Sequence, residues 1–177
     1  MFEALKAKGY GFENEILEIS KNTLNAQITG IKVQFLGHLY KNVNPVIVDE
    51  GVRMYDCPDI AAMKLNAVSQ RNTKKDFWDI DLLLDKYSLH DMFKFYEHKY
   101  DQRNFQHILR SLTWFEDADM EKDPICLRGR KWTDIKKRVI ASVKIYVDRS
   151  IAQRLNENKL IIQKEDEKKE KPRGLAE

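Results

Sequence analysis

The chain has 177 residues, 42% apolar and 33% charged, which suits one folded domain or a small domain with an added helical part. A formal net charge of +3 is too small to indicate a nucleic-acid-binding protein by itself. Its two cysteines lie far apart, which predicts reduced thiols in a cytoplasmic protein, and no apolar run is long enough to predict a membrane span.

The first fifty residues have the alternating pattern of a small sheet. We expect a short helix over residues 2–8 and strands over 13–19, 23–28 and 31–36, with a hairpin turn at Thr29-Gly30. In the third strand Ile31, Val33 and Phe35 face one side, and we predict that they pack on helices.

After residue 50 the apolar spacing becomes helical. Helices are predicted over about 56–70, from Thr73 to about 87, over 88–98 and 103–114, and from Trp132 onward, with a loop over 115–131. The first of them has its apolar face at Ile60, Met63, Ala67 and Val68. The predicted fold class is therefore α+β, with a sheet region over 1–50, a helical domain over 51–155 and a charged, disordered tail over 156–177.

A group of charged residues marks the corner between the first two long helices. Lys64 and Arg71 are seven residues apart and therefore share a helix face. The next turn places Lys75 and Asp76 at a helix N-terminus, and Asp79 lies three residues beyond Asp76 on the same face. Cations beside a helix N-terminus suit a polyphosphate ligand.

The same residues also have a purely structural interpretation. Asp76 can be a helix cap, Lys75 and Asp79 a surface pair, and Lys64 a side chain that reaches out from the edge of the core. On spacing alone the structural interpretation is favoured, because charge clusters usually lie on solvated faces.

Several segments together resemble one known family, the AbiEii/AbiGii-type nucleotidyltransferase toxins. The resemblance rests on Asp59-Ile-Ala-Ala-Met-Lys64, Gln70-Arg71 and Lys74-Lys75-Asp76-Phe77-Trp78-Asp79, with support from residues 33–38 and 111–119. It extends from about residue 5 to about residue 147, and its most specific part is the segment from Lys64 to Asp79.

The resemblance implies a polymerase-β-like nucleotidyltransferase sheet followed by a helical bundle. It also implies a toxin of bacterial toxin–antitoxin or abortive-infection systems that uses Mg²⁺ and a nucleoside triphosphate, with RNA as acceptor in some members and an antitoxin as partner. By the same resemblance Lys64, Arg71 and Lys75 would bind the nucleotide, and Asp76 and Asp79 would be the catalytic acids.

One part of the family pattern is missing from this sequence. The family carries a Gly-Gly or Gly-Ser turn before an Asp-x-Asp strand that holds the metal, and neither dipeptide occurs here. Asp79-Ile-Asp81 lies in a predicted helix, where the two side chains point about 200° apart. Gln34 occupies the strand position at which a third acid is expected.

Three hypotheses follow from this departure. In the first, an upstream segment or a separate polypeptide supplies the aspartates, and the isolated chain has little or no transferase activity. In the second, the chain is a non-catalytic member that binds a nucleotide, RNA or a protein partner. The third is a helical RNA-binding module. Four scattered histidines do not indicate a metal site under any of the three.

Overall fold

The computed structural model describes residues 7, 12–20, 23–28 and 30–170. The chain forms two compact units, Met1–Tyr40 and Lys41–Glu177, and each is described separately. The sequence analysis placed the boundary near residue 50. Apart from Ala7, the helix predicted over residues 2–8 lies outside the described residues.

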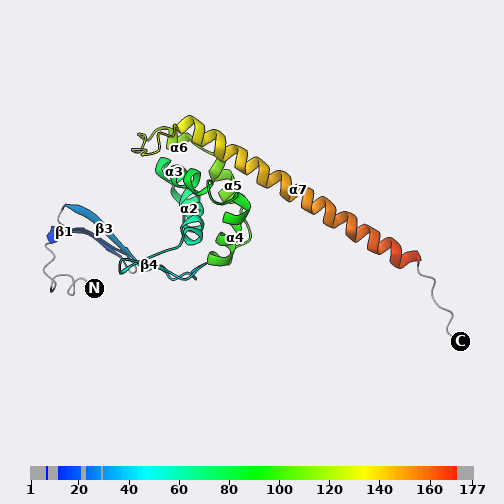
Figure 1. Ribbon diagram of the computed structural model, residues 1–177, viewed down its shortest axis with the longest axis horizontal. Coiled ribbons are helices and arrows are strands. Elements are labelled where there is room, and N and C mark those ends of the chain that lie inside the picture. Colours follow the sequence, from blue (N-terminus) through cyan, green and yellow to red (C-terminus); the bar gives the residue numbers. More distant parts are fainter. Residues whose placement is uncertain (1–6, 8–11, 21–22, 29, 171–177) are drawn as a thin grey trace. The chain divides into compact units, whose positions relative to one another are not determined.

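The first unit contains a three-stranded antiparallel sheet in the order β1-β2-β3 (Figure 1). Its strands are β1 (Phe12–Ser20), β2 (Thr23–Ile28) and β3 (Ile31–Leu36). Ile28 is opposite Ile31, so the hairpin closes around Gly30, whose φ of +78° glycine adopts without strain. Val33 and Phe35 are half-buried but Ile31 is exposed, so the predicted apolar face is only partly covered.

The second unit begins with a short hairpin and continues as helices. Strands β4 (Ile47–Asp49) and β5 (Val52–Met54) form a two-stranded sheet. The helices are α2 (Cys57–Arg71), α3 (Lys74–Leu83), α4 (Leu89–Tyr100), α5 (Gln106–Thr113), α6 (Glu116–Asp119) and α7 (Trp132–Glu170). The α+β class is as predicted. The described strands, however, form a meander and a separate hairpin, which is not the polymerase-β sheet that the resemblance implied.

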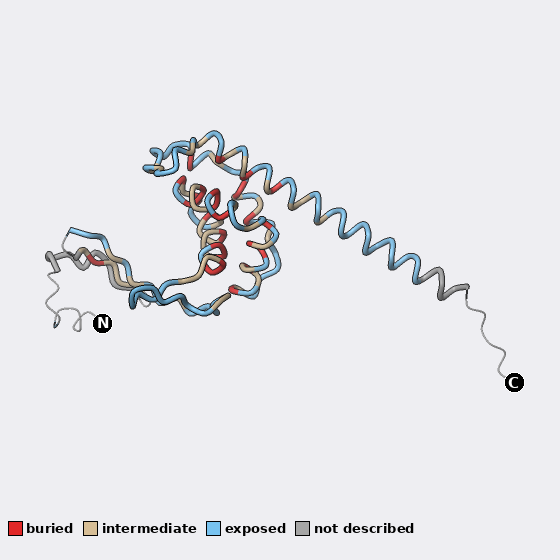
Figure 2. Tube along the Cα trace, in the orientation of Figure 1, coloured by how far each residue is buried: buried red, intermediate tan, exposed pale blue. Residues whose placement is uncertain are grey.

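Helix α2 is the centre of the helical unit, and α3, α4 and α5 all pack on it. Figure 2 shows buried residues on the central helices and, within α7, only on its first part. The largest fully buried side chains include Leu65, Phe77, Tyr96, Ile108 and Ile135. The core is therefore an assembly of helices that meet around α2.

The buried face of α2 agrees only in part with the predicted one. Of the four predicted residues, Val68 is fully buried, Met63 and Ala67 are half-buried and Ile60 is exposed, whereas Ala61, Leu65 and the carboxylate of Asp59 are fully buried. The sequence pattern missed this part of the face because it treats Asp59 as a solvent-facing residue, whereas in the folded chain Asp59 pairs with a buried cation.

The last helix is longer than the sequence predicts. Ile135, Val139 and Val143 of its apolar stripe are buried, but Ile151 is exposed. From residue 151 to 164 every side chain is exposed, and the helix continues to Glu170 through the segment predicted to be a disordered tail.

Candidate functional site

The turn between α2 and α3 positions the charged residues that the sequence brings together. Asn72 ends α2 in the left-handed conformation (φ 47°), and its N–H bonds to the carbonyl of Val68. Thr73 is the extended N-cap of α3, and its carbonyl accepts from the N–H of Asp76. The Thr73 hydroxyl donates to the Asp76 carboxylate at 2.6 Å, so the capping pattern predicted from sequence takes a different form.

Asp76 is the centre of this corner, and its side chain is fully buried. Its carboxylate accepts hydrogen bonds from Arg71 Nε at 2.7 Å, Arg71 Nη2 at 2.8 Å and Lys64 Nζ at 3.2 Å, in addition to the Thr73 hydroxyl. A carboxylate that receives four donors is well compensated for its burial. We call Lys64, Arg71, Asp76 and Asp79 the charged corner.

The second acid of the charged corner is more open to solvent. Asp79 Oδ2 lies 2.5 Å from Lys64 Nζ, and the Asp79 side chain is 44% exposed. Lys64 is 24% exposed and Arg71 is 51% exposed. Lys64 is thus shared by two carboxylates, while half of the Arg71 side chain faces solvent.

The electrostatics follow from these contacts. Burial by itself raises the pKa of Asp76, but hydrogen bonds from Arg71, Thr73 and Lys64 outweigh it and hold the pKa at about 2. Burial lowers the pKa of Lys64, and its bonds to Asp79 and Asp76 raise it above the ordinary value. Both groups are therefore charged at neutral pH.

Lys75 does not join the charged corner. It lies on the exposed face of α3, and its ammonium makes no ion pair among the residues that the structure describes. It lines a cavity of about 380 Å³ together with Trp78, Asp79 and Arg130. Neighbouring residues of a helix point about 100° apart, so Lys75 diverges from Asp76.

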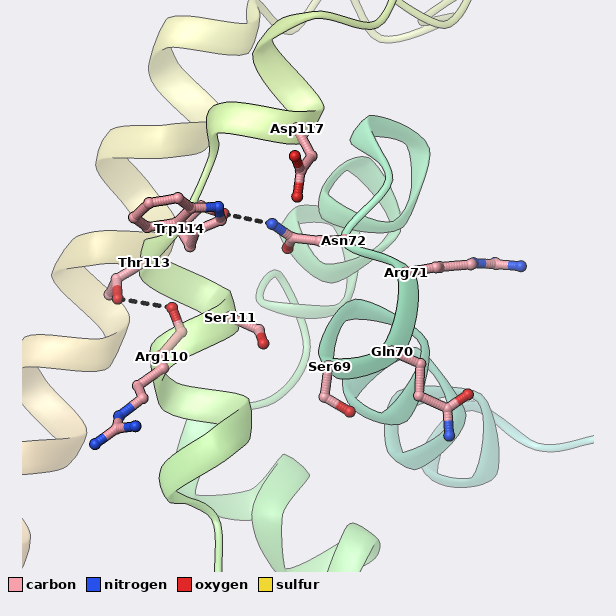
Figure 3. Close-up of a pocket in the computed structure, with 9 residues that line it drawn as sticks. All are labelled: Ser69, Gln70, Arg71, Asn72, Arg110, Ser111, Thr113, Trp114 and Asp117. Atoms are coloured by element: carbon pink, nitrogen blue, oxygen red, sulfur yellow. Dashed lines mark hydrogen bonds between the residues drawn. The ribbon is translucent and has the colours of Figure 1, made fainter.

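Lys64 and Arg71 both bind the carboxylate of Asp76, but they line two different cavities. Lys64 and Asp79 line a cavity of about 270 Å³ with Lys86 and Arg128. Arg71 lines another of about 520 Å³ between α2 and α5, shown in Figure 3. Asp76 therefore holds the two cations in place between two neighbouring cavities.

One family of known proteins matches residues 33–154, described as the nucleotidyl transferase AbiEii toxin of type IV toxin–antitoxin systems. This match covers well over half of the chain. The chain belongs to the AbiEii family. An uncharacterized protein of Aquifex aeolicus (strain VF5) is 38% identical over 106 residues, which make up 58% of this chain and 52% of that protein. The chain thus spans about half the length of that relative. No solved structure matches it.

The charged corner of this AbiEii-family chain does not fit the Mg²⁺ that the family implies. The carboxylate of Asp76 is occupied by four donors, and Asp79 is paired with Lys64. Mg²⁺ takes several oxygen ligands at once. Within the described part of the chain, no three His, Cys, Asp or Glu side chains are grouped as a metal site requires.

The Asp79-Ile-Asp81 segment of the AbiEii-family chain does not behave as a metal-binding pair either. Asp79 pairs with Lys64, whereas the buried Asp81 pairs with Arg130 at 2.7 Å and with Arg138 at 3.2 Å. The two acids bind different cations, as their positions on a helix predict. Asp81 instead connects α3 with the first part of α7 through its ion pair with Arg138.

The sequence analysis missed a second buried ion pair, at the first residue of the family signature. Asp59 Oδ1 lies 2.7 Å from Lys99 Nζ, and both side chains are fully buried. Asp59 also accepts from the N–H groups of Val43 and Asn44, and Lys99 donates to the carbonyl of Lys41. Burial raises the pKa of Asp59, but these bonds outweigh it and lower the pKa below its usual value. Lys99 is forty residues away in the sequence, and no local pattern identifies it as the partner.

Among the described residues of this AbiEii-family chain, no helix combines the length and apolarity that crossing a membrane requires.

Proposed function

We propose that the chain is a nucleotide-binding, nucleotidyltransferase-like member of a toxin–antitoxin system, and that another segment or polypeptide supplies its metal-binding aspartates. The observation that carries this proposal is the charged corner, where one buried carboxylate holds a lysine and an arginine at the N-terminal turn of α3. These residues lie within residues 33–154, which match the family.

Each residue of the charged corner has a distinct part in this proposal. Arg71 has five N–H donors, and Asp76 occupies only two of them, so the exposed edge of the guanidinium can bind a phosphate. Lys64 binds a second phosphate oxygen when it leaves Asp79. Asp76 is then a positioning residue that holds the two cations, and Asp79 is an anion that competes with phosphate for Lys64. The exposed Lys75 attracts the phosphates at longer range.

The partner and the acceptor are also part of the proposal. An antitoxin is the expected partner, because the family is described as part of a type IV toxin–antitoxin system. We propose a cytoplasmic protein of bacterial type with an RNA acceptor and a role in abortive infection, as the family resemblance implies.

A second candidate function is supported by the carboxylate of Asp76, which is already occupied by four hydrogen bonds. A non-catalytic member that keeps only its nucleotide, RNA or partner binding would need Lys64 and Arg71 held in place, but no free carboxylates.

An assay with radiolabelled nucleoside triphosphate, Mg²⁺ and RNA tests whether the isolated chain can transfer a nucleotide. We expect no label on RNA or protein; labelling that Lys64→Ala abolishes would show that the isolated chain is catalytically complete.

Calorimetric titration of the chain with nucleoside triphosphates tests the proposed function directly. We expect Arg71→Gln to weaken binding about tenfold, because it removes charge-assisted hydrogen bonds to phosphate. Lys137→Gln, at an exposed position of α7, is the matched control and should bind as the natural chain does. Thermal unfolding of both variants checks that Arg71→Gln remains folded. Undetectable binding to the natural chain at millimolar ligand would overturn the proposal.

A further inference from the structure

The strongest unexplained feature outside the charged corner is a buried amide oxygen. Asn72 is 9% exposed, and its Nδ2 donates to the carbonyl of Trp114 at 2.8 Å. Its Oδ1 is buried and accepts no hydrogen bond within the described structure. A buried acceptor without a donor is costly, so this oxygen suits a ligand that brings an N–H group.

Asn72 lines the cavity of about 520 Å³ between α2 and α5. A volume of this size is in the range of small-molecule sites. Figure 3 shows Ser69, Asn72 and Ser111 between the helices, while the guanidinium groups of Arg71 and Arg110 point outward on opposite sides. Uncharged polar side chains therefore lie between the helices, with cations at the rim and the carboxylate of Asp117 near Asn72.

Two of the hydroxyl groups that line this cavity have already used their hydrogens. The hydroxyl of Ser69 donates to the carbonyl of Asn66, and that of Thr113 donates to carbonyls of its own helix. Each hydroxyl hydrogen is thus used, and the oxygen remains as an acceptor. Asp117 adds a carboxylate to the same lining. The complementary ligand carries N–H donors, together with negative charge for the cations at the rim.

We propose that this cavity binds a nucleobase with an exocyclic amino group, which donates to Asn72 Oδ1, while the adjoining phosphate contacts Arg71. Trp114 is half-exposed and lines the cavity, where its indole can contact the flat face of a base. The inference rests on the proposed function, since Arg71 joins the cavity to the charged corner, and it specifies the class of base. The base belongs to a free nucleotide or to the end of an RNA strand, which share this chemistry.

Paired ligands that differ at the amino position test the inference. The natural chain is titrated with AMP against IMP and with CMP against UMP, and a second arm uses short oligo(A) and oligo(I) to separate free nucleotides from RNA. We expect each amino-bearing ligand to bind about tenfold more tightly than its oxo counterpart, because the amino group donates to Asn72 Oδ1, whereas the oxo group at the same position is an acceptor and repels that oxygen. Asn72→Gly keeps the left-handed backbone and should abolish this preference.

A cavity-filling substitution provides the second test. Ser111→Leu should eliminate binding of the base, whereas the matched Ser150→Leu, in a separate cavity between α5 and α7, should leave it unchanged. Circular dichroism and thermal unfolding show whether both variants are folded. If Ser111→Leu does not fold, the inference is tested with Asn72→Gly. Equal affinity for amino and oxo ligands, unaffected by these variants, would overturn the inference while leaving the proposed function intact. Absence of binding by every nucleotide would overturn both.

Discussion

Asp76 illustrates how one residue can organise a charged site without being available to a ligand. Its carboxylate is fully buried, and three side chains supply the four hydrogen bonds that compensate its desolvation. Arg71 and Lys64 come from the last three turns of α2, whereas Asp76 lies in the first turn of α3. The carboxylate therefore fixes the angle of the corner as well as the positions of the two cations.

The contribution of Asp76 to stability should depend on pH. Its pKa of about 2 is below the ordinary value of 3.8, so its stabilisation is present above about pH 4 and is lost as the pH falls toward 2. We expect Asp76→Asn to lower the free energy of unfolding at pH 7 by about 2 kcal/mol and to flatten its decline between pH 4 and 2. Urea unfolding at several pH values measures both effects. Asp148→Asn, at an exposed position of α7, is the control. If the free energy of unfolding of Asp76→Asn fell between pH 4 and 2 as steeply as that of the natural chain, Asp76 would not be the source of this pH dependence.

Spacing in the sequence predicted part of the charged corner. Lys64, Arg71 and Asp76 meet as a seven-residue interval and a short turn require. Lys75 was grouped with them because it is adjacent in sequence, but the helix turns it to the exposed face. The unpaired oxygen of Asn72 could not be predicted, because it depends on Trp114, forty-two residues further along the chain.

At the scale of elements, the sequence was most informative where the pattern is local. Strands β2 and β3 begin and end at the predicted residues, and α4 begins beside the predicted residue 88, where Ser88 and Asp91 form both bonds of a helix cap. The buried face of α2 was predicted only in part, because a distant ion pair, and not apolar periodicity, decides the burial of Asp59. The extent of α7 beyond its packed stripe was also missed, because no neighbouring element determines where it ends.

The Asp59–Lys99 pair connects three elements, namely the segment before β4, helix α2 and helix α4. We expect Lys99→Met to lower the free energy of unfolding by about 3–5 kcal/mol, because it leaves a buried carboxylate without its cation. Adding Asp59→Asn should recover part of the loss, since a neutral amide oxygen can still accept from the N–H groups of Val43 and Asn44. Denaturant unfolding measures both variants, and amide exchange at Val43 and Asn44 should accelerate in the single variant. A double variant less stable than the single one would contradict this role.

At the scale of the whole molecule, the family match and the structural units divide the chain differently. The match covers residues 33–154 and so includes most of β3 in the first unit and most of the second unit. The aligned segment is only about half of the relative from Aquifex aeolicus. The sequence identified the family from a few motifs in and around α2 and α3. It did not identify metal ligands, because the acids of its most specific segment are paired with cations in the folded chain.

The most direct test of a phosphate-binding corner is to remove the anion that competes for Lys64. The natural chain and Asp79→Asn are titrated with a nucleoside triphosphate, each with and without Mg²⁺. We expect Asp79→Asn to bind several-fold more tightly, with or without Mg²⁺, because Lys64 then has one carboxylate partner fewer and the corner gains one unit of positive charge. Weaker binding by Asp79→Asn only when Mg²⁺ is present would instead identify Asp79 as a metal ligand and contradict the proposed arrangement.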